Sequence, residues 1–393
     1  MPPRILVVGA GFAGAVHARE LADAGYRVDV IDRRPHIAGN AYDEVDGNGV
    51  RIHRYGPHLF HTNNEAVLRW LERFGTFIPY RHRVQALLPG GACVPLPINR
   101  ATIATVFSVP LDDAAAAAAF LARLAVPCPA PRNAAEYLAA TIGTELTDLF
   151  FRPYTKKMWG LDLEALDPAV VRRIRLRLDD EEQYFPDDRF QVLPRDGYTA
   201  LFERMLAHPS IHVTLGESFD PAMARSYAAC FNSMAIDEYF DFRFGALPYR
   251  SIRFHHRTEP DAYACGDAPV VNFTDAGPFT RQTDWSRLPG HRVRATGSKT
   301  LTLEEPCADH ENHDERYYPV KAADGRFDAI YRKYRALAEA QPAMQFIGRC
   351  GTYQYLDMHQ VINQSLQGVR AWIAAHDVFQ DGGIPGRGLK RLQ

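Results

Sequence analysis

Residues 5–32, ILVVGAGFAGAVHARELADAGYRVDVID, constrain the fold of this chain more than any other segment. Four apolar residues at 5–8 predict a buried strand, and a G-x-G-x-x-G motif then predicts a tight turn into a helix. The glycines of this motif are Gly9, Gly11 and Gly14. Gly25 is suited to cap the helix, and a second strand ends at Asp32. This order predicts a β-α-β unit that binds a dinucleotide, with the pyrophosphate at the helix N-terminus and Asp32 accepting hydrogen bonds from a ribose.

Composition narrows the class of protein. The chain has 393 residues, enough for two or three packed units, and its 46% hydrophobic and 23% charged residues are typical of a globular enzyme. A net charge of −2 argues against nucleic acid or an anionic membrane as partner, so local arginines must bind any anionic ligand. The six cysteines are scattered, no apolar run approaches 18 residues, and the first strand leaves no room for a signal peptide. We therefore expect a cytoplasmic enzyme with reduced thiols and no membrane span.

Hydrophobic periodicity divides the rest of the chain into three parts. Residues 64–74 and 99–165 favour helices, and in the second of these Asn133 followed by Glu136 resembles an N-cap box. Residues 237–305 favour strands interrupted by Gly and Pro, whereas 327–337 and 358–373 have the spacing of amphipathic helices. The Gly-rich and basic tail at 381–393 is expected to fray. Only one dinucleotide motif is present, so a reductant such as NAD(P)H would have to act without a domain of its own.

Histidines occur in two short motifs. In GPHLFHT (56–62) the two histidines lie in a loop before a helix, where hydrogen-bonded structural histidines are commoner than catalytic ones. No nearby carboxylate or cysteine completes a metal-ligand set there. His310 and His313 lie in DHENHDE, which is polar enough to be a solvated loop. We therefore predict no metal site.

Three further segments have two interpretations each. In YTKKMWG (154–160) the aromatic residues either cover the core or stack on a base or sugar. RRIRLRL (172–178) alternates arginine with apolar residues, which predicts a half-buried strand that is either a solvated edge or a clamp for a diphosphate. In RCGTYQYLDMHQVI (349–362), Asp357 either caps a helix or lies where the helix N-terminus faces the redox ring of a flavin.

Eight segments in order resemble the UDP-galactopyranose mutase family. They are GAGFAGAVHAREL, IAGNAYD, YGPHLFHT, YTKKMWG, YFPDDRFQ, GYTALFERML, IDEYFDFRFGALPYRSIRF and GTYQYLDMHQVI. The resemblance covers almost the whole chain. It implies an α/β fold in which a Rossmann-like FAD-binding domain carries an inserted helical bundle and an antiparallel β-sheet substrate domain. The implied boundaries are 1–80, 194–236 and 320–393 for the FAD-binding domain, 99–170 for the helical domain with a mobile substrate loop, and 81–98, 171–193 and 237–319 for the sheet domain.

The resemblance also implies an activity. Members of the family interconvert UDP-galactopyranose and UDP-galactofuranose with no net redox change. Their FAD must be reduced, and its N5 acts as the nucleophile on the anomeric carbon. The expected partners are a nucleotide-diphosphate sugar and an external reductant such as NAD(P)H, and homo-oligomers are common in the family. Its products serve cell-wall and polysaccharide biosynthesis.

Site residues follow from the matching positions. The catalytic candidates are His58, Arg173 and Arg281. The candidates for substrate binding are Tyr154, Trp159, Tyr184, Asn272, Tyr317 (with Tyr318 beside it) and Tyr355. The candidates for cofactor binding are Gly9, Gly11, Phe12, Ala13, Gly14, Asp32, Arg33, Gly39, Asn40, His58, Arg349, Asp357 and Met358.

Departures from the family pattern leave the nucleotide sugar open. Met158 stands where the family commonly has a glutamine that can pair with uracil. The usual G-G-N turn is Ala38-Gly39-Asn40, and Asn232-Ser233 replaces a common Thr-Gly pair. The same reaction on a GDP-linked, dTDP-linked or N-acetylated sugar is therefore an alternative. Two others are a flavin oxidoreductase similar to amine oxidases and a flavin-binding protein without activity.

Overall fold

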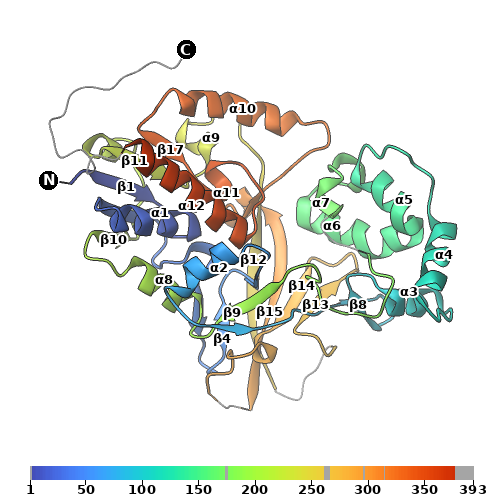
Figure 1. Cartoon of the computed structure of the whole chain (residues 1–393). Coiled ribbons are helices and arrows are strands. Elements are labelled where there is room, and N and C mark those ends of the chain that lie inside the picture. The colour runs from blue at the N-terminus through green and yellow to red at the C-terminus, as the bar shows by residue number, and fades with distance from the viewer. Residues whose placement is uncertain (1, 173–175, 261–265, 295–296, 314, 377–393) are drawn as a thin grey trace.

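The computed structural model describes residues 2–172, 176–260, 266–294, 297–313 and 315–376. A lobe built on a parallel sheet contains both ends of the described chain, and a separate group of helices forms a second lobe (Figure 1). A long, mostly antiparallel sheet lies between the two lobes (Figure 1). The expected α/β class, with a Rossmann-like unit, a helical insertion and a second sheet, is confirmed.

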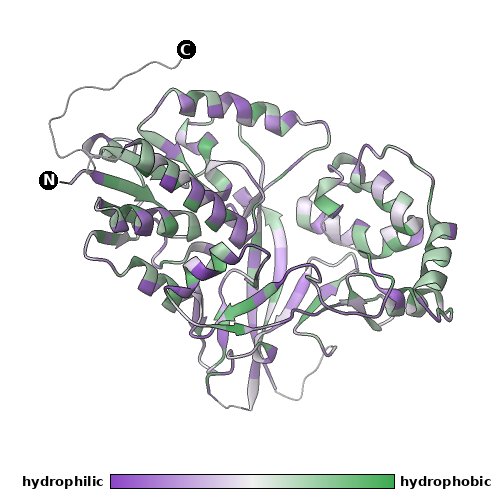
Figure 2. Cartoon of the chain, viewed as in Figure 1, coloured by the Kyte–Doolittle hydropathy of each residue, from purple (hydrophilic) through white to green (hydrophobic). Residues whose placement is uncertain are grey.

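The parallel sheet forms the dinucleotide-binding lobe. Its strands, in spatial order, are β10 (Ile211–Leu215), β2 (Arg27–Asp32), β1 (Arg4–Val8), β11 (Ala229–Asn232) and β17 (Met344–Phe346). Strand β1 is buried from Ile5 onwards and is hydrophobic over most of its length (Figure 2). Helices α1 (Phe12–Asp23) and α12 (Met358–Ala375) pack against each other beside this sheet. The predicted strand, turn, helix and strand at 5–32 are thus confirmed.

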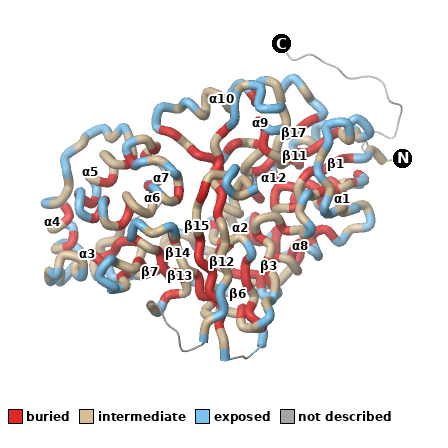
Figure 3. The backbone as a smooth tube through the Cα atoms, turned by 180° about the vertical axis from the view of Figure 1, so that it is seen from behind, coloured by how far each residue is buried: buried red, intermediate tan, exposed pale blue. Residues whose placement is uncertain are grey.

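The second sheet has seven strands. In spatial order they are β16 (Tyr318–Pro319), β12 (Tyr249–Pro260), β15 (Ser298–Ala308), β14 (Arg281–Asp284), β13 (Val270–Phe273), β7 (Val84–Leu87) and β8 (Cys93–Leu96). All neighbouring pairs are antiparallel except β13 and β7, which are parallel. Most of β15 is buried, whereas β12 is buried only near its start, at Tyr249, Ser251 and Ile252; Figure 3 shows both strands from behind. This sheet therefore supplies a rigid floor between the two lobes.

The helical lobe has its own apolar core. Its helices are α3 (Arg100–Phe107), α4 (Ala114–Leu124), α5 (Ala134–Leu146), α6 (Arg152–Trp159) and α7 (Ala169–Arg172). The predicted N-cap is confirmed, because the Asn133 side chain accepts a hydrogen bond of 2.9 Å from the Glu136 backbone N–H. Gly143 kinks α5 at φ +80°, and a short π-turn over Thr147–Phe151 leads into α6.

The strand predicted over 172–178 is wrong where the structure describes it. Arg172 ends α7, and residues 176–178 form no strand. A strand needs a neighbouring edge, but here the backbone makes one isolated hydrogen bond, from Arg177 N–H to the Ile98 carbonyl at 2.8 Å. The Arg177 side chain forms an ion pair of 2.7 Å with Asp179. Arg173 and Arg175 lie outside the described residues.

The remaining elements pack mainly on the dinucleotide-binding lobe. Strands β5 (Phe60–Thr62), β9 (Phe190–Pro194) and β6 (Phe77–Pro79) form a three-stranded sheet, and β3 (Asp43–Val45) pairs with β4 (Arg51–His53). The other helices are α2 (Glu65–Glu72), α8 (Tyr198–Leu206), α9 (Ile236–Tyr239), α10 (Arg326–Glu339) and α11 (Gly348–Gly351).

The helices predicted at 64–74, 327–337 and 358–373 are confirmed by α2, α10 and α12. The strand prediction for 237–305 is wrong at its start, because α9 and a turn occupy the segment before β12. The predicted tail at 381–393 lies outside the described residues. None of the described helices combines the length and the hydropathy needed to span a membrane.

Candidate active site

Three cavities adjoin one another between the end of β2 and the seven-stranded sheet. The first, of about 310 Å³, is lined by Asp32, and the second, of about 170 Å³, by the start of α1. The third, of about 650 Å³, lies against the seven-stranded sheet and the N-terminus of α12. The first two share Gly11, Asn40, Ser233, Arg316 and Cys350. The second and third share His58, Tyr317, Arg349 and Met358. The shared walls make one continuous path for an elongated ligand.

The glycine turn of the first two cavities fits a dinucleotide. Gly9 has φ +100°, and a Cβ on Gly14 would lie 1.8 Å from the Gly9 carbonyl oxygen, so strand and helix pack this closely only with glycine. A Cβ on Gly11 would be 3.6 Å from the Gly39 Cα. Among the described residues, no side chain caps the N-terminus of α1, which leaves its first N–H groups for an anionic group.

Asp32 holds the turn in shape. Its Oδ2 accepts a hydrogen bond of 2.7 Å from the Ala10 N–H, and its Oδ1 accepts one of 2.9 Å from the Arg34 N–H. Asp32 also lines the first cavity, where the predicted ribose contact would form. Each carboxylate oxygen can accept a second hydrogen bond, so both functions are compatible.

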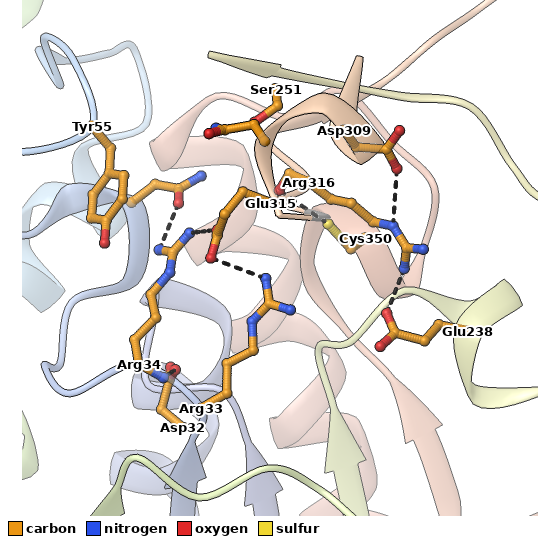
Figure 4. Close-up of polar contacts among 12 residues, drawn as sticks. Asp32, Arg33, Arg34, Tyr55, Glu238, Ser251, Asp309, Glu315, Arg316 and Cys350 are labelled. Carbon is orange, nitrogen blue, oxygen red and sulfur yellow. Dashed lines mark hydrogen bonds and ion pairs between the residues drawn. The ribbon is translucent and has the colours of Figure 1, made fainter. Parts of the chain in front are cut away.

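Glu315 joins the sheet to the dinucleotide-binding lobe beside the first cavity (Figure 4). Its Oε2 accepts a hydrogen bond of 2.5 Å from Arg34 Nη2, and its Oε1 lies 3.3 Å from Arg33 Nη2. The Arg34 Nη1 donates to Asn40 Oδ1 at 2.9 Å, and its guanidinium lies 4.3 Å from the centre of the Tyr55 ring. Burial acts to raise the pKa of Glu315, but the charges of Arg34 and Arg33 outweigh it and lower that pKa. We define Glu315, Arg33 and Arg34 as the Glu315 clamp.

Arg316 lies in the walls of the first and second cavities. Its Nη1 is 2.5 Å from Glu238 Oε2 and its Nε is 3.4 Å from Asp309 Oδ2, as Figure 4 shows. The two carboxylates come from different elements and fix the guanidinium between them.

His58 lies where the second and third cavities meet. It is buried, its Nδ1 is 2.9 Å from the Gly56 carbonyl oxygen, and its backbone N–H donates to His53 Nδ1 at 3.0 Å. Burial lowers the pKa of His58 to about 4, so the ring is neutral near pH 7. A neutral imidazole thus lies between the second and third cavities without adding charge.

Arg281 carries a positive charge in the third cavity. It faces Glu304 across β14 and β15, with Nε 3.2 Å from Glu304 Oε2, and its Nη2 donates to the Tyr154 hydroxyl at 2.9 Å. Burial acts to lower the pKa of Arg281, but the charge of Glu304 outweighs it and raises that pKa well above its ordinary range. Arg281 is therefore a fixed cation available to an anionic ligand.

Lys157 attaches α6 to the sheet below the cavity. Its Nζ donates to the carbonyl oxygens of Phe273, Asp275 and Phe279 at 3.1, 2.9 and 2.8 Å. These carbonyls lie at the end of β13 and in the loop to β14, beside Asn272 and Arg281. Burial lowers the pKa of Lys157. Lys157, the second lysine of the motif YTKKMWG, thus has a structural function: it attaches α6 to the sheet.

Most predicted site residues line the three cavities. All predicted cofactor positions do so, and so do Arg281, Tyr184, Asn272, Tyr317 and Tyr355. Tyr154 and Trp159 are not in these walls: Tyr154 contacts Arg281, and Trp159 packs on Tyr318 and Tyr355 with ring centres 5.1 and 5.6 Å apart. Arg173 lies outside the described residues.

Four side-chain polar atoms of residues in the wall of the third cavity are buried and have no hydrogen-bond partner among the described residues: Arg281 Nε, which is ion-paired with Glu304 Oε2, His359 Nδ1, Asn272 Oδ1 and Glu304 Oε1. The last two are an amide oxygen and a carboxylate oxygen. Both are acceptors, so hydroxyl groups of a bound molecule would satisfy them.

Comparisons with known proteins agree with this site. A family model of UDP-galactopyranose mutase matches residues 149–355, and a model of the NAD(P)-binding Rossmann-like domain matches residues 7–74. The dTDP-fucopyranose mutase of Escherichia coli is 33% identical over 94% of this chain and 98% of its own length. A probable UDP-galactopyranose mutase of Klebsiella pneumoniae is 34% identical over 92% of this chain and 93% of its own. The chain belongs to the UDP-galactopyranose mutase family.

A solved structure of reduced UDP-galactopyranose mutase has the same fold. Its TM-score is 0.74 at 18% identity, and the match covers 95% of this chain and 96% of the solved one. For this member of the UDP-galactopyranose mutase family, the expectations of a mutase and of FAD as cofactor are confirmed.

Some residues in the walls of this mutase-family site were not predicted. They are Arg34, Glu304, Glu315, Arg316, His61, His82, Asp188 and His359. Glu304 could have been predicted from the sequence. It ends the alternating segment TLTLE at a position that faces inward, and a buried carboxylate needs a cation beside it. The others depend on contacts between distant segments. Within the described ranges, no group of three His, Cys, Asp or Glu residues could hold a metal ion.

Proposed function

We propose that this chain interconverts the pyranose and furanose forms of a nucleotide sugar, with UDP-galactopyranose and UDP-galactofuranose as the main pair. The observation that carries this proposal is the shared wall of the second and third cavities, which contains His58, Tyr317, Arg349 and Met358. A flavin whose nucleotide part occupies the first two cavities would reach this wall with its ring. A sugar in the third cavity would then be in contact with it.

The chain's own residues bind and orient the two ligands. The turn at Gly9–Gly14 and the Glu315 clamp would hold the pyrophosphate and the adenosine part of FAD. FAD supplies, when bound in its reduced form, the nucleophile of the reaction. The protein then needs to hold the nucleotide sugar in register with it and to keep water away.

Arg281 would bind the diphosphate. Its guanidinium is fixed by Glu304 and by the Tyr154 hydroxyl, so it can offer its remaining donors without losing rotamer freedom. Asn272 Oδ1 would accept a hydrogen bond from a sugar hydroxyl. Arg173, the second arginine expected from the family, would add a further positive charge.

A dTDP-linked sugar is the second candidate. Met158 lines the third cavity with Ile252, its carbonyl oxygen is held by Arg250 Nε at 3.0 Å, and its apolar side chain would suit the C5-methyl group that thymine has and uracil lacks. One full-length relative is named a dTDP-fucopyranose mutase, which fits the same interpretation.

A substrate panel on reduced enzyme tests both candidates. The enzyme is reduced with dithionite, given UDP-galactofuranose or dTDP-fucofuranose without oxygen, and the products are separated by chromatography. We expect conversion to the pyranose form with reduced enzyme and none with oxidised enzyme. Flavin reduction by the substrate itself would favour the oxidoreductase alternative, and lack of conversion of every nucleotide sugar would reject the proposal.

Three expectations beyond the reaction belong to the same proposal. They are an external reductant such as NAD(P)H, a homo-oligomeric assembly and a cytoplasmic location. Stopped-flow reduction of the flavin by NADH and NADPH would test the first, and light scattering would test the second.

A further inference from the structure

His61 and Asp188 form a hydrogen-bonded dyad in the wall of the third cavity. His61 Nδ1 lies 2.5 Å from Asp188 Oδ2, and Asn63 Nδ2 donates to Asp188 Oδ1 at 3.0 Å. The His61 ring stacks on Phe185 with ring centres 3.6 Å apart and planes within 8°. These four residues all line the cavity. The carboxylate therefore fixes the orientation of the imidazole, and Phe185 holds its plane.

The second ring nitrogen of His61 is available to a ligand. The only hydrogen bond of the ring within the described part of the chain is the one at Nδ1, and Nε2 is not among the buried atoms without a partner. With Asp188 at Nδ1, the neutral ring carries its proton on Nδ1 and presents an acceptor at Nε2. The His61 ring lies 5.4 Å, centre to centre, from the ring of His359, and His359 directly follows Met358, a residue of the wall shared by the second and third cavities. The dyad is thus near the end of the cavity where the cofactor and substrate would meet.

The proposed reaction needs such a group. Conversion of a galactopyranose into a galactofuranose breaks the bond between C1 and the ring oxygen O5 and forms one between C1 and O4. A proton leaves O4 and a proton arrives at O5, while no electrons are gained or lost overall. His58 is poorly suited to this transfer, because its Nδ1 faces the Gly56 carbonyl oxygen and burial lowers its pKa to about 4.

We propose that His61 Nε2 accepts the proton from O4 and returns it to O5, with Asp188 as the residue that positions His61. This inference rests on the proposed function and adds a catalytic residue to it. His61 and Asp188 have the same net charge before and after one catalytic cycle, because the proton taken from O4 is given to O5, so no co-reactant is required. A histidine in this role typically accelerates a reaction by about 10²–10⁴-fold.

Further titratable groups lie near the His61 and Asp188 dyad. His82 approaches His61 from the segment before β7, and His359 with Asp357 lies at the start of α12. The rings of His61 and His359 are 5.4 Å apart, and His359 Nδ1 is buried without a partner among the described residues.

Steady-state kinetics of the reduced holoenzyme test the inference. His61→Gln should lower kcat by about 100-fold and leave KM within about twofold, because the glutamine keeps the size and polarity but cannot transfer the proton. Asp188→Asn should lower kcat by about tenfold and change the pH profile of kcat, since His61 keeps its imidazole but loses its oriented tautomer. His212→Gln, at an exposed position on β10, is the matched control and should leave both constants unchanged.

The outcomes separate this inference from the proposed function. Flavin absorbance and thermal unfolding are recorded for each variant, so that loss of cofactor or fold is recognised. If wild type converts the furanose substrate and His61→Gln keeps kcat within threefold, the inference is overturned while the function stands. An increase in KM with unchanged kcat would overturn it too, because His61 would then only bind the diphosphate. If wild type converts no nucleotide sugar, the proposed function fails and the inference fails with it.

Discussion

Arg281 and Glu304 occupy paired positions on β14 and β15, and both side chains point into the same cavity. Glu304 is buried, with 3% of its side chain exposed, and Arg281 is 26% exposed. The strand pairing sets their separation, so the cation is placed by the backbone of the sheet rather than by a loop. A sheet-mounted cation of this kind keeps its position whether or not a ligand is present.

Removing this cation should destabilise the fold. Arg281→Met leaves the carboxylate of Glu304 buried without its partner, and we expect the free energy of unfolding to fall by about 3–5 kcal/mol. The double variant Arg281→Met, Glu304→Leu should recover most of that loss, because both charges are then gone. Urea unfolding at pH 7 gives the free energies of unfolding of the single and the double variant. Equal stability of the single variant and wild type would contradict the prediction.

Gly14→Ala should prevent the β-α-β unit from forming correctly. The added Cβ would be placed 1.8 Å from the Gly9 carbonyl oxygen, which is backbone and cannot move aside cheaply. We expect protein with less than a tenth of the FAD content of wild type, measured by flavin absorbance after purification. Gly47→Ala is the control, since nothing lies within 4 Å of a Cβ there and its flavin content should be normal.

Two neighbouring lysines should respond differently to the same substitution. Lys157→Met leaves three carbonyl oxygens without their donor, and we expect it to lower the free energy of unfolding by about 2 kcal/mol and to raise KM. Lys156→Met removes an exposed ion pair with Asp162 and should change both quantities little. Thermal unfolding and initial rates distinguish the two, and similar behaviour of both variants would argue against an anchoring role for Lys157.

Loss of the Glu315 clamp should weaken retention of the cofactor. Glu315→Gln keeps the shape but removes the charge that holds Arg33 and Arg34, and we expect FAD to dissociate about tenfold faster. Release is followed by the fluorescence of free FAD after dilution. Glu339→Gln removes an exposed i, i+4 ion pair with Arg335 and should release FAD at the wild-type rate.

Stability should fall as the pH is lowered, in a window set by buried histidines. Burial lowers the pKa of His17, His58 and His291 to about 4 and that of His82 to about 3. Between about pH 4 and 6.5 the unfolded chain binds protons that the folded one does not, so the free energy of unfolding rises with pH, by at most about 1.4 kcal/mol per unit for each histidine. Thermal melts from pH 4.5 to 7.5 should show this slope. Replacing His291 by Gln should reduce it, and His212→Gln should leave it unchanged.

Local patterns in the sequence pointed to residues that line the first two cavities. The glycine spacing, the strand at 5–8 and Asp32 are neighbours in sequence, so the turn they form follows from the chain itself. The turn before α12 predicted a helix that begins at Asp357, either as its cap or facing a flavin; Asp357 caps α12, in a capping box with Gln360. Each of these predicted positions lines one of the three cavities.

Contacts between distant segments could not be predicted in this way. The pairing of Arg281 with Glu304 depends on the register of β14 against β15, and the dyad of His61 and Asp188 joins residues 127 positions apart. The alternation at 172–178 has the period of a strand, yet no neighbouring edge pairs with residues 176–178 and Arg172 belongs to α7. An alternating pattern shows which side chains would share a face if the segment were a strand. Whether the strand forms depends on a neighbouring strand with which it can pair.

Tyr317 is common to the second cavity, the third cavity and a further one of about 390 Å³ beside the Glu315 clamp. Its hydroxyl is tied to the Tyr55 carbonyl oxygen at 2.7 Å, so a shift of this ring changes the shape of all three spaces together. A ligand that displaced the Tyr317 ring from one of these spaces would therefore change the affinity of the other two for their own ligands. Such coupling is reciprocal: if a ligand in one space changes the affinity for a ligand in another by some factor, the second ligand changes the affinity for the first by the same factor.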